Sequence, residues 1–129
     1  MKSIKIYIIL SIILFISVGC VQQKMDADSF NKLLSHRNMG LAYLEEERYT
    51  DAVKEFMTFI NIAPSEAFGY ANAGWAYLQS PGKLDSAEIM IKQAMKLSPG
   101  NPDISFLAAK MFELTNRTSQ AMEVLRHTI

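Results

Sequence analysis

The chain has 129 residues, with 13 basic and 13 acidic side chains and a formal net charge of zero. This length suits one domain, and the balanced charge gives no net field that would draw the protein to nucleic acid or to an acidic surface. Half of the residues are hydrophobic, and the single cysteine, Cys20, excludes an internal disulfide, a cysteine zinc cluster and a CxxC redox pair.

The first nineteen residues follow the three-part pattern of a secretory signal peptide. Lys2 and Lys5 form a short basic start, and an uncharged, strongly apolar run extends over residues 6–18 before Cys20. A helix over this run would be roughly 20 Å long, which is short for a hydrocarbon core of about 30 Å. We therefore expect residues 1–19 to be an export signal rather than a permanent membrane span.

The end of this segment, Ser17-Val18-Gly19-Cys20, resembles a bacterial lipoprotein signal. The resemblance implies cleavage before Cys20, lipid on Cys20 and a polar tether over residues 20–29. In an organism with two membranes the periplasmic side of the outer one is favoured, because Val21 replaces the aspartate that often marks retention at the inner one. The alternative is an uncleaved signal anchor in which Cys20 is an incidental thiol.

Beyond residue 30 the chain repeats residue types at spacings of 34 and 35 residues. Small residues recur at two positions, large apolar or aromatic residues recur at two others, and proline closes the first two units. The aligned sets are Gly40, Gly74 and Ala109; Tyr43, Tyr77 and Phe112; Ala52, Ala87 and Ala121; Phe56, Ile91 and Leu125; and Pro64 and Pro99. The change of spacing falls in residues 79–83, a turn segment where an insertion costs little.

This pattern resembles the tetratricopeptide repeat (TPR), a pair of antiparallel helices, over roughly residues 33–129. It implies an all-α fold: an α-solenoid of three helix-turn-helix repeats in a right-handed superhelical arc, after an N-terminal apolar signal helix. The repeat domain is expected over 30–129, with units at about 33–66, 67–101 and 102–129. Helices are expected near residues 30–45, 50–62, 66–79, 85–97, 102–114 and 118–128.

Two helix starts are predicted from capping patterns. Asn101 followed by Pro102 predicts an N-cap and a first helical residue. Asp85 with Glu88 three residues later predicts a capping box at the start of the fourth helix.

The resemblance also implies a binding groove, because proteins of this family generally hold a peptide or helix against the first helix of each unit. Carried over by position, the groove residues are Arg37, Leu41, Leu44, Ala71, Trp75, Leu78, Phe106, Lys110 and Glu113. Leu41 and Trp75 stand where a clamp for a C-terminal carboxylate would need asparagine. An amphipathic helix or an extended apolar segment is therefore the expected ligand. The alternative for Trp75 is packing in the core between units.

No residue pattern in the sequence predicts catalysis, a cofactor or a metal site. His36 is expected to pack in the first helix, and His127 to lie in the last turn of the chain, where a cation suits the helix dipole. Basic residues do not form a stripe with aromatic residues, so a nucleic-acid partner is not expected.

These observations predict a protein that is not an enzyme. We expect an exported TPR lipoprotein that acts as a protein-interaction or assembly module at a membrane, as in secretion, pilus or envelope assembly. The alternative is a self-associating structural spacer that docks through an apolar edge of its last helix, formed by Met122, Val124, Leu125 and Ile129.

Overall fold

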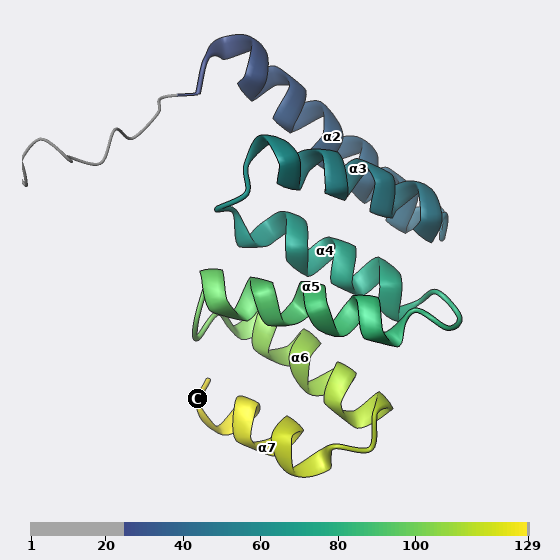
Figure 1. Ribbon diagram of the computed structural model, residues 1–129, viewed down its shortest axis with the longest axis vertical. Helices are drawn as coiled ribbons and strands as arrows, with labels where there is room; N and C mark the ends of the chain where they lie inside the picture. Colours follow the sequence, from purple (N-terminus) through teal and green to yellow (C-terminus); the bar gives the residue numbers. More distant parts are fainter. Residues whose placement is uncertain (1–24, 129) are drawn as a thin grey trace, which may run out of the picture.

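The computed structural model describes residues 25–128, which fold into α-helices joined by short turns (Figure 1). The helices are α2 (Ala27–Glu45), α3 (Tyr49–Ile62), α4 (Ala67–Leu78), α5 (Leu84–Leu97), α6 (Pro102–Leu114) and α7 (Thr118–Arg126). The predicted all-α class is thereby confirmed. The predictions for the signal segment, for Cys20 and for Ile129 lie outside the described residues.

The helices stack in chain order into an elongated solenoid of helix pairs, with α2 at one end and α7 at the other (Figure 1). Helices pack within the pairs α2–α3, α4–α5 and α6–α7, and consecutive pairs meet through α3–α4 and α5–α6. The first helices of the second and third pairs, α4 and α6, also touch. Each unit therefore contacts only its neighbours, as expected for stacked repeats. Within residues 25–128, no helix combines the length and the apolar character needed to cross a membrane.

The predicted start of α6 is confirmed in detail. The Asn101 side chain accepts hydrogen bonds from the backbone N–H groups of Asp103 (3.0 Å) and Ile104 (3.2 Å), and Pro102 occupies the first helical position. These bonds satisfy two of the amide groups that a helix start leaves without partners.

Two other helix starts differ from the predictions. Helix α2 begins at Ala27, inside the segment expected to be a tether, because Asp26 accepts a hydrogen bond from the Ser29 backbone N–H at 2.9 Å and so caps the helix. The predicted capping box of α5 is wrong. Its N-cap residue is Lys83, which makes no side-chain cap, and Glu88 is engaged by a distant arginine instead.

Glycines stand where helices approach most closely. A β-carbon on Gly40 would lie 2.6 Å from Cε1 of Phe56, and one on Gly74 would lie 2.6 Å from Cγ1 of Ile91. Gly69, which is not among the aligned repeat positions, likewise allows α4 to lie close to Phe59 and Ile60 of α3. Large buried residues of the second helices thus fill the space that glycines leave in the first helices.

The middle of the solenoid is tied together by aromatic contacts. Phe56 of α3 is fully buried, and its ring meets the ring of Phe68 edge-on at a centroid distance of 6.0 Å. Phe59, one turn further along α3, lies 5.3 Å from the same ring. Phe68 on α4 is therefore held in place by two core side chains of the preceding unit.

The first and third units end their first helices with the same turn. The backbone N–H of Arg48 donates to the Tyr43 carbonyl and that of Arg117 to the Phe112 carbonyl, both at 2.8 Å. Each arginine also lies over the ring of that aromatic residue, at 4.3 Å and 4.9 Å respectively. The middle unit lacks this arrangement because its turn, residues 79–83, is longer.

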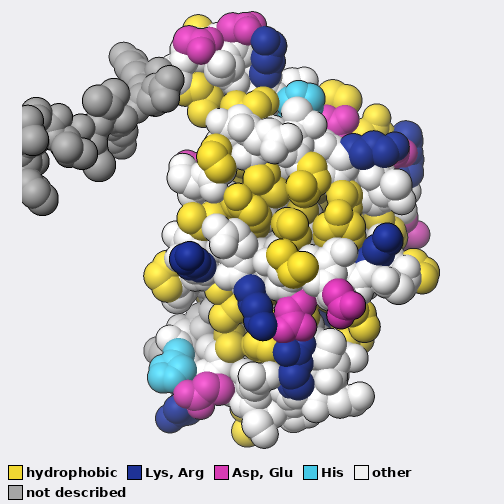
Figure 2. All heavy atoms as spheres, viewed as in Figure 1, with side chains coloured by type: hydrophobic (Ala, Val, Ile, Leu, Met, Phe, Trp, Pro, Cys, Tyr) yellow, Lys and Arg dark blue, Asp and Glu magenta, His cyan; other side chains and the backbone are white. Residues whose placement is uncertain are grey.

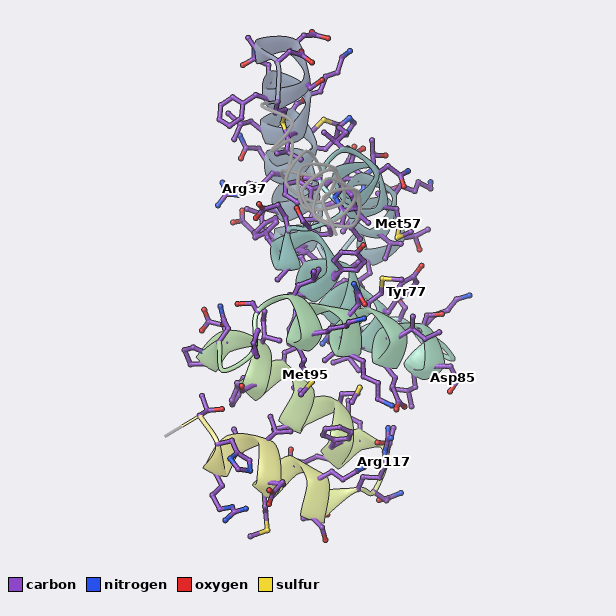
Figure 3. All side chains as sticks on the ribbon, turned by 60° about the vertical axis from the view of Figure 1, so that its left-hand side comes forward. Arg37, Met57, Tyr77, Asp85, Met95 and Arg117 are labelled. Carbon is purple, nitrogen blue, oxygen red and sulfur yellow. The ribbon has the colours of Figure 1, made fainter. Side chains whose placement is uncertain are left out.

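An ion-pair network joins the second unit to the third. The Arg117 guanidinium donates two hydrogen bonds to the Glu88 carboxylate, at 2.8 Å and 2.6 Å, and Lys92 approaches the same carboxylate at 2.7 Å. Figure 3 shows Arg117 at the start of α7, on the same edge of the molecule as Asp85 in the first turn of α5. The hydrogen bonds from Arg117, and to a smaller extent that from Lys92, lower the pKa of the Glu88 carboxyl group from 4.5 to about 2.

This lowered pKa predicts a defined pH dependence. Because the folded-state pKa of Glu88 lies below its ordinary value, its stabilising contribution is complete above about pH 4.5 and is lost as the pH falls towards 2. Glu88→Gln should destabilise the protein by about 1 kcal/mol at pH 7, and the difference from the native protein should vanish near pH 2. Thermal unfolding followed by circular dichroism across this range measures the effect.

Glu113→Gln is the matched control, because the exposed Glu113 takes part in no ion pair among the described residues. Its unfolding midpoint should follow that of the native protein at every pH. Identical pH profiles for Glu88→Gln and Glu113→Gln would show that the network contributes nothing measurable.

Candidate functional site

A cleft of about 530 Å³ opens between α4 and the start of α6. These are the first helices of the second and third units, so the cleft lies on the surface where the sequence predicts a groove. Its lining is mostly apolar and comes from Ala67, Phe68, Ala71, Asn72, Trp75, Asn101, Asp103, Ile104, Phe106 and Leu107. Such clefts, with a few polar groups at their edges, are the usual form of a ligand site.

The α4 wall of the cleft is supported by contacts with the core and with α2. Phe68 is fixed from behind by the aromatic core, and the guanidinium of Arg37, on α2, lies 5.0 Å from the centre of its ring. The Asn72 amide group donates to the Phe68 carbonyl at 2.9 Å, which leaves its side-chain oxygen as an acceptor. Trp75 is half-buried: it packs against the core cluster of α5–α7 and also lines the cleft.

The α6 wall carries the most exposed aromatic side chain near the cleft. Phe106 is 66% exposed, whereas its neighbours Ile104 and Leu107 are buried. A large apolar side chain exposed beside an apolar cleft marks a surface that a ligand can cover.

The structure brings together four of the nine predicted groove residues. Ala71, Trp75 and Phe106 line the cleft, and Arg37 borders it through Phe68. The other five do not line it. Leu41 and Leu44 pack partly buried against the core cluster of α3 and α4, Leu78 packs against the cluster of α5–α7, and Lys110 and Glu113 lie further along α6.

Several residues of the cleft were missed by sequence reasoning. Phe68 and Asp103 stand three residues before the predicted Ala71 and Phe106, on the same helix faces. Extending each predicted face by one turn towards the helix start would have found both. Asn72 and Leu107 likewise stand three residues before the predicted Trp75 and Lys110, and Ala67 stands four before Ala71. Asn101 and Ile104 carry no such signal, since their place in the cleft depends on how α4 and α6 cross.

The two histidines lie away from the cleft. His36 Nδ1 is 2.7 Å from the Glu55 carboxylate, half-buried between α2 and α3, and His127 Nε2 is 2.7 Å from Glu123 within α7. In the part of the chain that the structure describes, no three acidic, histidine or cysteine side chains gather as a metal site would need.

A second hollow lies at the turns, but its chemistry is different. It is bordered by the start of α3 and by residues 79–83, and three of its charged groups pair with one another, since Asp51 lies 2.8 Å from Arg48 and 3.2 Å from Lys54. Figure 2 shows the surrounding face, with hydrophobic side chains over α3 and α4 and charges of both signs below them. In Figure 3, Arg37 lies at the left and Met57 at the right of the molecule, so Arg37 is on the opposite side from Met57 of α3.

Comparison with known proteins identifies the repeat. Residues 37–66 match the family model of the tetratricopeptide repeat, which confirms the family predicted from the spacing. The match covers the second part of α2, the whole of α3 and the turn that follows. No curated protein matches the sequence.

Several solved structures share the fold. The second TPR domain of Spaghetti (RPAP3), bound to an HSP90 peptide, is 20% identical, with 80% of this chain and 96% of that chain aligned at a TM-score of 0.70. The TPR2B domain of yeast Sti1 in its pHsp70 complex is 23% identical. The alignment covers 75% of this chain and 77% of that chain, with a TM-score of 0.71. The Yersinia enterocolitica type III secretion translocator chaperone SycD is 16% identical. The alignment covers 76% of this chain and 74% of that chain, with a TM-score of 0.70. At these identities the similarity shows the fold.

Proposed function

We propose that this protein is a non-enzymatic interaction module that binds a segment of another protein in the cleft between α4 and α6. The observation that carries the proposal is the apolar cleft itself, with Trp75 and the exposed Phe106 among its lining residues. Two structures with a similar fold are complexes with peptides, which supports a peptide as the ligand here.

The cleft favours an apolar ligand segment. Trp75 and Phe106 offer aromatic surface, and aromatic residues in a desolvated pocket commonly dominate binding energy. Among residues 25–128, Asp103 is the only charged side chain that lines the cleft. A helix or extended segment that inserts a bulky apolar side chain fits this surface.

The proposal is tested by removing the exposed aromatic residue. Phe106→Ala should weaken partner binding at least roughly thirtyfold, as expected for loss of a central aromatic contact worth about 2 kcal/mol. Because Phe106 is 66% exposed, the helical fold should persist. The partner is captured by cross-linking with the native protein, and its affinity for each variant is then measured by calorimetry.

Ile89→Ala is the matched control. Ile89 lies on α5, is 64% exposed and does not line the cleft. The Ile89→Ala variant should bind the partner with the affinity of the native protein. Equal affinity of Phe106→Ala, Trp75→Ala and the native protein would reject the cleft as the binding site, whereas loss of helicity in Trp75→Ala would assign Trp75 to the core.

We also propose that the protein is exported and held at a membrane by lipid on Cys20, where it serves in assembly or secretion. The support is the signal pattern of residues 1–20. The Cys20→Ser variant should then keep its signal segment and fail to incorporate labelled fatty acid. Equal labelling of the variant and the native protein would contradict lipidation at this residue.

The second candidate function, a self-associating spacer, rests on α7. Met122 is 68% exposed and Leu125 36%, although Phe56 and Ile91, the repeat equivalents of Leu125, are fully buried. Val124, expected on the same edge, instead packs against the core cluster of α5–α7. Dimers that weaken on Met122→Glu would favour this function, and a monomer at all concentrations in sedimentation would exclude it.

A further inference from the structure

We infer that the cleft selects a ligand by its charge order: a bulky apolar side chain with an acidic residue on the α2 side and a basic residue on the α6 side. This inference rests on the proposed binding function and adds the charge pattern of the ligand and the direction in which it lies.

The cation is Arg37. Its side chain is exposed on α2, and its guanidinium lies 5.0 Å from the centre of the Phe68 ring at the edge of the cleft. None of the ion pairs between described residues includes Arg37. Stacking on a fixed aromatic ring holds the planar group in place while its N–H donors stay available for a carboxylate.

The anion is Asp103, on the opposite wall. It lines the cleft in the first turn of α6, where the helix dipole favours a negative charge. Asn101 already caps the first amide groups of this helix, so the Asp103 carboxylate is not occupied by capping. Among the described residues Asp103 joins no ion pair, and it therefore keeps its capacity for a basic ligand group.

Apolar surface lies between the two charges. Phe68, Trp75 and Leu107 line the space that separates the α2 side from the start of α6. Going from α2 to α6, a ligand meets a cation, an apolar surface and then an anion. A ligand with the complementary order gains two attractive contacts, whereas one in the reverse order brings like charges together as it covers apolar surface.

Selection from a library of short random peptides displayed on phage tests this inference. Peptides that bind the native protein but not Trp75→Ala are sequenced. We expect them to share a bulky apolar residue with Asp or Glu on one side and Lys or Arg on the other. A synthetic copy of one such peptide should bind about tenfold more tightly than a version with its two charges exchanged, measured by fluorescence anisotropy.

Exchanging the protein charges should reverse the preference. The double variant Arg37→Glu, Asp103→Lys should bind the charge-exchanged peptide more tightly than the original. Lys96→Glu is the matched control, because Lys96 is an exposed cation of α5 outside the cleft. It should keep the native preference.

The two ways of failing are distinguishable. Trp75-dependent peptides without a charge pattern, bound equally well after their charges are exchanged, would overturn the inference and leave the binding function standing. If the library yields no peptide whose binding depends on Trp75, the proposed function fails, and the charge order fails with it.

Discussion

Phe56→Ala should lower the free energy of unfolding by about 3–5 kcal/mol, the largest loss expected for one substitution in this protein. Phe56 is fully buried, fills the space beside Gly40 and meets the Phe68 ring edge-on. Alanine would leave a cavity where α2, α3 and α4 meet. Since small domains are stable by only about 5–15 kcal/mol, this loss should bring the protein close to unfolding.

Urea unfolding followed by circular dichroism measures this effect, and the chain offers a control with the same chemical change. Phe106→Ala removes an identical side chain that is 66% exposed, so it should cost less than about 1 kcal/mol. Comparable losses for the two variants would contradict the assignment of Phe56 to the centre of the core.

The loss of Phe56 should also reach the cleft. The Phe68 ring contacts the Arg37 guanidinium and also packs against the rings of Phe56 and Phe59. Without Phe56, Phe68 loses one of its two aromatic supports. The cleft is thus built on the same side chains that hold the repeats together, which links the stability of the solenoid to the shape of its candidate binding site.

The repeat architecture could be predicted from sequence because each repeated residue type has a local steric cause. Gly40 and Gly74 recur where a helix must approach its partner, and Phe56 and Ile91 recur because they fill the space opposite those glycines. In a solenoid each unit meets only its neighbours. No long-range topology had to be guessed, and the spacing was enough to place the helices within about three residues at each end.

One error arose where a distant partner decides the structure. Asp85 and Glu88 satisfy the capping-box spacing, but Glu88 pairs with Arg117, a residue of the next unit. A local pattern carries no information about such a partner. At Asp26 the opposite happened: a local cap was present, and the polar composition of the surrounding segment concealed it.

The difference between local patterns and distant partners also explains which residues of the candidate site could be predicted. Trp75 and Phe106 follow from repeat positions, because the face of a helix is fixed by its periodicity. Whether a residue on that face lines a cleft depends on the angle and depth at which two helices pack. Leu41 packs, partly buried, against the α3–α4 core for that reason, while Leu107, which was not among the predicted groove residues, lines the cleft.

The second large effect concerns close packing between α4 and α5. In an exposed helix, replacing glycine by alanine stabilises by about 1 kcal/mol. At Gly74 we expect the opposite sign, with Gly74→Ala destabilising the protein by about 2 kcal/mol, because the new β-carbon would lie 2.6 Å from Cγ1 of Ile91. Ile91 is fully buried and branched at its β-carbon, so it has little room to move away.

A double-mutant cycle separates this clash from other effects. Ile91→Ala removes the atom that Gly74→Ala would meet, so the double variant should be more stable than the sum of the two single losses indicates. A coupling free energy near zero would mean that the β-carbon at residue 74 meets something other than Ile91. Stabilisation by Gly74→Ala alone would show that α4 and α5 can separate without cost, and the close approach would then not be the reason for glycine at this position.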